Sequence, residues 1–294
     1  MKIFIFLSVQ FFLFFNLYAQ ESSTYLGQDT PDLDPQVFAE EFLPKGAYLH
    51  TVSFTADGKE CYFTAESRAY NGGTIMVSKL ENGKWTNPKP APIPGTYREI
   101  DPLITPDGSA MLYCTNRPVN EGDAVTGNMD IWMIKRVGQS WGKPMYLGAD
   151  VNTEGQDWFP TITRSGTLYF SPWIGDVSNI HTSMMKDGKY QKSRKLSDQV
   201  NSPNLDYDPL ISPDESFLIF CSDRPNGYGD VDLYVCFKKE NGSWTKAKNM
   251  GNRINTEGAE FAPTISPDGK YLFFARDKQI YWVKSDIINQ FKSR

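Results

Sequence analysis

Histidine is scarce in this chain, which has 294 residues and only His50 and His181 of that type. A histidine-rich metal centre is therefore excluded, because such a centre draws several imidazole ligands from one chain. Excess positive charge is also missing, since 30 Lys and Arg face 35 Asp and Glu for a formal net charge of -5. Nucleic-acid binding requires a basic surface that neutralises phosphates, so nucleic acid is not an expected partner.

Cysteine is limited to four residues, namely Cys61, Cys114, Cys221 and Cys236. In an exported protein four cysteines could form two disulfides. In the expected hairpin register Cys221 faces Leu233, and Cys236 then lies roughly three residues further along the strands, too far to bridge. We expect all four to be buried small hydrophobic residues. The chain also lacks CxxC, HExxH, Walker and GxSxG signatures, and we expect neither a cofactor nor a bound metal.

Long hydrophobic runs are absent except at the N-terminus. There Lys2 precedes an apolar stretch over residues 3–17, and Ala19 offers a small residue at a cleavage site. This pattern predicts a signal peptide at residues 1–19, followed by an N-terminal extension at 20–36. We therefore expect export to the periplasm or to the cell surface, or secretion, with no transmembrane segment after signal removal.

Aromatic residues, glycine and proline are abundant instead. Aromatic side chains make up 14% of the chain, beside 23 Gly and 19 Pro. This composition favours many short strands joined by turns over a helical bundle. We therefore expect an all-β protein.

A short phrase recurs about every fifty residues and divides the chain into five copies. The copies are Phe54-Thr55-Ala56-Asp57-Gly58, Ile104-Thr105-Pro106-Asp107-Gly108, Ile162-Thr163-Arg164-Ser165-Gly166, Ile211-Ser212-Pro213-Asp214-Glu215 and Ile265-Ser266-Pro267-Asp268-Gly269. Each phrase reads as a tight turn between two strands, and a third and a fourth strand follow in most copies. Four-stranded units of this period indicate a β-propeller.

The propeller is expected to have five blades of four antiparallel strands, with six blades as the alternative, and to occupy residues 37–286 as one domain. The fifth copy has no fourth strand, because the chain ends soon after Trp282. Residues 37–43 alternate like a strand, and we expect them to complete the fifth blade and close the ring. The tail from Asp286, including residues 287–294, is expected to contain a short helix.

Three runs carry a family resemblance, namely residues 206–214, 220–234 and 250–258. They resemble the WD40-like, TolB-type propeller repeat, which is common in exported proteins of Gram-negative bacteria. The resemblance covers residues 37–286 and implies the propeller fold. It says little about function, since propellers include both binding modules and enzymes.

Two columns of residues precede the turn phrase on the strand expected to line the propeller axis. The first column is acidic in four copies, with Glu99, Asp157, Asp206 and Glu260 after Leu49 in the first copy. The second column is mostly aromatic and consists of His50, Ile100, Trp158, Tyr207 and Phe261. We expect the acids to ring one mouth of the central channel beside the aromatic residues. Carboxylates next to flat rings suit a sugar or a cation.

Three further residues are candidate ligand contacts. Trp173 breaks the repeat in the third copy, whereas Arg117 and Arg224 occupy matching places after the second strand of their copies. The two arginines are more readily explained as ties between loops, because a guanidinium has several donors in one plane.

The favoured interpretation is an exported, monomeric, non-catalytic module that binds an envelope protein or a glycan. The alternative is an enzyme that resembles glycoside hydrolases, in which Glu99, Asp157, Asp206 and Glu260 provide the acid and the base or nucleophile. A catalytic pair should be unique in position, whereas this acidic column recurs in four copies. The recurrence favours a structural role for the acids and a binding role for the protein.

Overall fold

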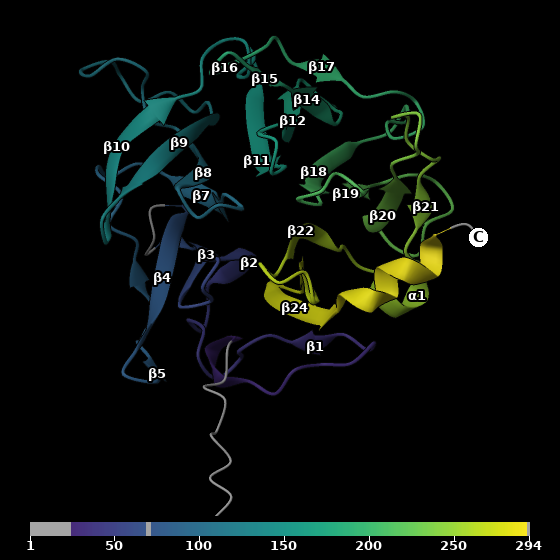
Figure 1. Ribbon diagram of the computed structural model, residues 1–294, viewed down its shortest axis with the longest axis horizontal. Helices are drawn as coiled ribbons and strands as arrows, with labels where there is room; N and C mark the ends of the chain where they lie inside the picture. Colours follow the sequence, from purple (N-terminus) through teal and green to yellow (C-terminus); the bar gives the residue numbers. More distant parts are fainter. Residues whose placement is uncertain (1–24, 69–71, 293–294) are drawn as a thin grey trace, which may run out of the picture.

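Five four-stranded blades surround a central axis in the computed structural model, which describes residues 25–68 and 72–292 (Figure 1). The expected five-bladed propeller is therefore confirmed. In each blade the strand that precedes the turn phrase lies innermost, and these inner strands contact one another around the axis.

The strands follow the repeat closely. The first blade contains β2 (Tyr48–Phe54), β3 (Glu60–Glu66) and β4 (Thr74–Glu81), with β5 (Lys84–Trp85) and β6 (Lys89–Pro90) both paired to β4. The second contains β7 (Glu99–Ile104), β8 (Ala110–Thr115), β9 (Asp130–Val137) and β10 (Ser140–Tyr146). The third contains β11 (Gln156–Ile162), β12 (Leu168–Ile174), β14 (His181–Ser183) and β17 (Arg194–Lys195), with β13 (Val177–Ser178) and the hairpin β15 (Met185–Lys186) and β16 (Lys189–Tyr190).

The remaining elements complete the ring. The fourth blade contains β18 (Asp206–Ile211), β19 (Phe217–Ser222), β20 (Asp232–Phe237) and β21 (Lys248–Asn249). The fifth contains β22 (Phe261–Ile265), β23 (Tyr271–Arg276), β24 (Gln279–Lys284) and β1 (Gln36–Val37). The helical segments are short: η1 (Tyr25–Gly27), α1 (Gly251–Ile254) and η3 (Ser285–Phe291). The last of these is the helix expected in the tail.

The recurring turn phrase forms the inner hairpin of each blade. In the first blade Thr55 Oγ1 donates to Asp57 Oδ1 at 2.7 Å, and Lys59 N donates to the same oxygen at 3.1 Å. Gly58 adopts a φ of +67°, a conformation that glycine reaches without steric cost. Asp followed by Gly fixes this hairpin in the first, second and fifth copies, whereas the third has Ser165-Gly166 and the fourth Asp214-Glu215.

The N-terminal strand closes the ring, as expected from the incomplete fifth copy. Gln36 and Val37 of β1 pair antiparallel with Trp282 and Tyr281 of β24. The strand is shorter than the expected residues 37–43, because the chain turns at Ala39, whose φ is +50°. Phe38 nevertheless lies buried beyond the end of the strand, against the aromatic rings of the first and last blades.

The hydrophobic core lies between blades, where aromatic side chains fill the wedge-shaped spaces. Tyr62 and Val77 of the first blade pack with Tyr113 and Trp132 of the second. The aromatic excess of the sequence is explained by these interfaces, since a sheet buried on both faces needs large apolar side chains on both.

All four cysteines are free and buried, as expected. The predicted hairpin register is also correct, since Cys221 pairs with Leu233 and Leu218 with Cys236. Within the two described stretches of chain, no helix combines the length and apolar character needed to span a membrane. The expected signal at residues 1–19 lies outside the described residues.

Ring closure generates a stability prediction. Phe38 is fully buried, and its ring centroid lies 5.1 Å from that of Phe273 and 5.2 Å from that of Trp282. We expect Phe38→Ala to lower the free energy of unfolding by about 3–5 kcal/mol, because it leaves a cavity at the seam of the ring. Urea denaturation measures this change. Val177→Ala, at a residue 57% exposed, is the control and should change stability by less than about 0.5 kcal/mol. Equal midpoints for the two variants would contradict the proposed importance of the seam.

Candidate functional site

Each inner strand contains one residue in the left-handed conformation, at the same position in every blade. These residues are Thr51, Asp101, Phe159, Asp208 and Ala262, with φ between +49° and +55°. The strand pairing shifts register at each of them, which makes each a β-bulge. A bulge bends its strand and changes the direction of neighbouring side chains. Backbone strain of this kind concentrates at functional sites.

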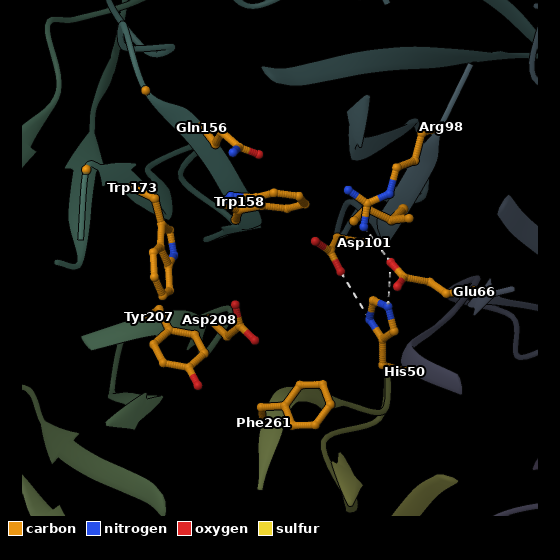
Figure 2. A pocket seen from close by; sticks show the side chains of 13 residues that line it. His50, Glu66, Arg98, Asp101, Gln156, Trp158, Trp173, Tyr207, Asp208 and Phe261 are labelled. Carbon is orange, nitrogen blue, oxygen red and sulfur yellow. Dashed lines mark hydrogen bonds and ion pairs between the residues drawn. The ribbon is translucent and has the colours of Figure 1, made fainter. Parts of the chain in front are cut away.

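A pocket of about 640 Å³ opens at the mouth of the channel that lies next to the five bulges (Figure 2). We call it the mouth pocket; its lining residues are His50, Glu66, Arg98, Ile100, Asp101, Gly155, Gln156, Trp158, Trp173, Gly175, Tyr207, Asp208 and Phe261. The whole second column of the repeat is among them. At the opposite end of the inner strands, around the turn phrases, the cavity is only about 90 Å³.

One side of the mouth pocket is a network of charged groups. His50 Nδ1 lies 3.4 Å from Asp101 Oδ1, and its Nε2 lies 3.5 Å from Glu66 Oε1. Thr51 Oγ1 donates to Asp101 Oδ1 at 2.8 Å, and Arg98 Nη2 donates to Glu66 at 2.8 Å. Burial alone would lower the pKa of His50, but its hydrogen bonds to Asp101 and Glu66 outweigh burial and raise the pKa to about 9. The network therefore holds two cations and two anions at neutral pH.

The other side is an aromatic wall made of Trp158, Trp173, Tyr207 and Phe261. Trp173 and Tyr207 meet edge to face with ring centroids 5.5 Å apart. The guanidinium of Arg98 already lies over Trp158, at 5.3 Å from the ring centroid. The wall thus offers both apolar faces and an affinity for positive charge.

Asp208 projects between the aromatic wall and the charged network (Figure 2). The N–H of Ala262 donates to its Oδ2 at 3.2 Å. In the described part of the chain, no basic nitrogen lies within 4.0 Å of this carboxyl group. Burial, with a smaller contribution from the charge of Asp101, raises the pKa of Asp208 to about 8.

Trp173 reaches the pocket because the third blade departs from the repeat. The end of β12 pairs with β13, an additional short strand, with Trp173 opposite Ser178. Gly155 lies against this extension, and a Cβ atom there would lie 2.1 Å from the carbonyl oxygen of Trp173. Only glycine fits that close approach. The irregularity that singled out Trp173 in the sequence therefore shapes the pocket wall.

The acidic column does not form the expected ring around the mouth. Glu99, Asp157, Asp206 and Glu260 are buried and do not line the mouth pocket. They precede the second column by one residue, and neighbouring residues on a strand point to opposite sides. The alternative in which these four acids catalyse glycan cleavage therefore fails on geometry.

Three of these acids bind the loop that enters their own blade. Asp157 accepts a hydrogen bond from Thr153 N at 2.7 Å, and Asp206 accepts one from Ser202 N at 2.6 Å. Glu260 accepts one from the N–H of Thr256 at 2.9 Å. A carboxylate four residues beyond a loop amide thus orders each of these loops.

Arg117 and Arg224 tie loops to these acids and do not line the mouth pocket. Arg224 Nη2 lies 2.7 Å from Asp206 Oδ1 and also donates to the carbonyl oxygen of Val200. Arg117 pairs with Glu99 at 3.3 Å and donates to a neighbouring carbonyl in the same way. A planar guanidinium can bind a carboxylate and a carbonyl together. The two arginines therefore make the ties between loops that the sequence favoured for them.

Sequence reasoning missed the three acids that line the mouth pocket, namely Glu66, Asp101 and Asp208. Asp101 and Asp208 stand immediately before proline in the repeat, next to the column that was chosen. Their own column contains an acid in only two of five copies. An acid that is unique in position is the kind expected to bind a ligand, and this property distinguishes the column that follows the second one.

The comparisons with known proteins identify a fold and no family. No model of a known protein family matches the chain, and no curated protein matches it either. A solved structure described as a glycoside hydrolase is similar with a TM-score of 0.55, 11% identity and coverage of 87% of this chain and 92% of that one. The α-L-arabinofuranosidase of Lactobacillus brevis is similar with a TM-score of 0.52, 12% identity and coverage of 80% and 86%. At such identities the likeness shows the propeller fold alone. Within the described residues, no group of three or more His, Cys, Asp or Glu side chains is arranged to hold a metal ion.

The structural role of the acidic column can be tested at Asp206. Its side chain is fully buried against Arg224, so Asp206→Asn leaves a partly buried guanidinium without its counter-charge. We expect a loss of about 3 kcal/mol in the free energy of unfolding, measured by urea denaturation. Asp187→Asn, in an exposed hairpin turn with a φ of +50° that asparagine tolerates, is the matched control. A loss below about 0.5 kcal/mol at Asp206 would show that the acid does not hold the loop.

Asp157 makes stability depend on pH. Burial, opposed by the hydrogen bond from the Thr153 amide, raises its pKa from 3.8 to about 7. The folded state holds the proton of Asp157 more tightly than the unfolded chain does, so the protonated carboxyl group adds to the free energy of unfolding. This contribution is complete below about pH 4 and is lost as pH rises through 7. We expect the wild-type free energy of unfolding to fall between about pH 5 and 8, with Asp157 contributing roughly 3 kcal/mol to the fall.

Asp157→Asn should flatten this pH profile, because an amide keeps the hydrogen bond to Thr153 without a proton to lose. Denaturant unfolding at several pH values compares the variant with wild type and with Asp187→Asn. Burial also raises the pKa of Glu99 to about 7. The contribution of Glu99 to the free energy of unfolding is lost over the same pH range, so the profile of the variant should keep some slope. Parallel profiles for wild type and Asp157→Asn would contradict the assignment.

Proposed function

We propose that this protein binds a saccharide in the mouth pocket without converting it. The observation that carries the proposal is the aromatic wall facing a network of hydrogen-bonding groups across one pocket. A sugar ring has apolar faces that stack on aromatic rings and a polar edge that needs donors and acceptors.

The dimensions of the pocket support a small ligand. Its volume of about 640 Å³ falls within the range of roughly 300–1,000 Å³ typical of small-molecule sites. The narrow cavity at the other end of the channel favours binding at this mouth alone. A short saccharide or the end of a longer glycan would fit such a site.

The state of the charged groups supports binding over catalysis. Asp101 and Glu66 are both engaged by His50, and Glu66 is engaged by Arg98 as well. These partners hold the carboxylates in place as acceptors for hydroxyl groups. Burial alone would raise the pKa of Glu66, but its contacts with His50 and Arg98 lower it below its usual value, which makes Glu66 a weaker nucleophile or general base.

A second candidate function is glycoside hydrolysis by Asp208 and Asp101. The raised pKa of Asp208 makes it a proton donor at neutral pH, while Asp101 lies in an ion pair with His50. A protonated and an ionised carboxyl group on one pocket is the pattern of glycosidases. The fold shared with a glycoside hydrolase is compatible with this candidate.

We also propose that the protein acts outside the cytoplasm. The expected signal peptide and the resemblance to exported repeat proteins favour a glycan of the cell envelope as the ligand. A monomer is expected in that setting.

Truncation of the aromatic wall tests the binding proposal. Trp173 is partly exposed in the pocket, so Trp173→Ala should weaken saccharide binding at least about 10-fold without unfolding the protein. Isothermal titration with cellobiose, N,N′-diacetylchitobiose and an arabino-oligosaccharide measures the change. Trp85→Ala removes the same side chain from β5, outside the mouth pocket, and should leave affinity unchanged.

Two results would revise the proposal. If neither the three saccharides nor the β-1,4-linked dimer of glucosamine binds to the wild-type protein, saccharide binding at this pocket is wrong. If wild type releases reducing ends from one of them and Asp208→Asn does not, the protein is a hydrolase and the second candidate replaces the first.

A further inference from the structure

The charges of the mouth pocket do not balance when Asp208 is ionised. His50 and Arg98 supply two positive charges, and Glu66 and Asp101 supply two negative charges that are paired with them. Asp208 is the remaining acid. Among the described residues, one group donates a hydrogen bond to its carboxyl oxygens, and that group is the neutral amide N–H of Ala262.

The surroundings of Asp208 are those of a cation site. Figure 2 shows the side chains of Trp158, Trp173, Tyr207 and Phe261 around the carboxyl group of Asp208, and all four line the same pocket. Aromatic faces attract cations that approach to within about 6 Å of the ring centre, and rings arranged as a cage select ammonium groups. Arg98 already uses the face of Trp158 in this way.

We propose that the saccharide bound in the mouth pocket carries an ammonium group, which lies within the aromatic wall against the carboxyl group of Asp208. The ligand is then an amino sugar with a free amine and not a neutral sugar. This inference rests on the proposed function, because it names the class of saccharide that the same pocket accepts.

The state of Asp208 without a cation is consistent with this pairing. Its pKa is raised to about 8 by burial, so the carboxyl group is largely protonated at neutral pH and has no charge to compensate. A bound ammonium group would stabilise the ionised form, and the proton would leave to solvent. The titratable groups that surround Asp208 are Asp101, His50, Tyr48, Tyr207, Cys114 and Cys221.

A matched pair of disaccharides tests the inference. Cellobiose and the β-1,4-linked dimer of glucosamine differ in the group at C2 of each ring, hydroxyl in one and amine in the other. At about pH 6, where the amines are protonated, titration calorimetry should show the amino sugar binding at least about 10-fold more tightly to wild type. Asp208→Asn should bring the two affinities to within about 2-fold, while Asp187→Asn, on the outer hairpin, should keep the preference.

A second pair of probes separates the cation site from the sugar site. Choline and 3,3-dimethylbutan-1-ol have nearly the same shape, and only choline is charged. If neither disaccharide binds but choline is preferred over the alcohol and Asp208→Asn removes the preference, the proposed function fails and the cation site stands. If both disaccharides bind equally to wild type, or if the preference survives Asp208→Asn, the inference is overturned and saccharide binding stands. If no probe binds, both are overturned.

Discussion

The left-handed residue in each inner strand is the constraint on which the site depends. An undisturbed inner strand would keep strict alternation of its side chains along its length. The bulges at Thr51, Asp101, Phe159, Asp208 and Ala262 interrupt this alternation at the same level in all five blades. Such strain costs on the order of 1–3 kcal/mol per residue and persists where the surrounding structure holds it. Here the surrounding hydrogen bonds do so, as Asp101 N donates to Thr64 Oγ1 and Asp208 N donates to Ser171 Oγ.

Those hydrogen bonds cross from one blade to the next, and this links the site to the stability of the ring. Thr64 belongs to the first blade and Asp101 to the second, while Ser171 belongs to the third and Asp208 to the fourth. The pocket residues are therefore positioned by contacts between blades, and they depend on the closure made by β1 and β24. A rigid ring with one residue per blade at its mouth can hold a small ligand from several sides.

The two kinds of acid in this protein differ in what surrounds them. Asp206 and Glu260 are matched by Arg224 and Arg276 and by loop amides, so their charge stabilises the blades. Asp208 accepts a hydrogen bond from one amide and shares the mouth pocket with four aromatic side chains, and among the described residues no basic nitrogen lies within 4.0 Å of its carboxyl group. Unpaired acids beside a pocket are the ones available to a ligand. Burial alone does not distinguish the two kinds, because Asp101 in the pocket is as buried as the structural acid Glu99.

The sequence by itself determined the repeat, the turn chemistry of Asp57 and Gly58, the five blades and the closure of the ring, because these follow from local propensity and from period. It also placed His50, Trp158, Tyr207 and Trp173 at one mouth, which the structure brings together in one pocket. It could not decide that Glu99 and its equivalents face the loops while Asp101 and Asp208 face the channel. That choice is made by the bulges and by hydrogen bonds between blades. A shift of one residue in the register of a strand moves each of its side chains to the opposite face, and only the folded ring fixes the register.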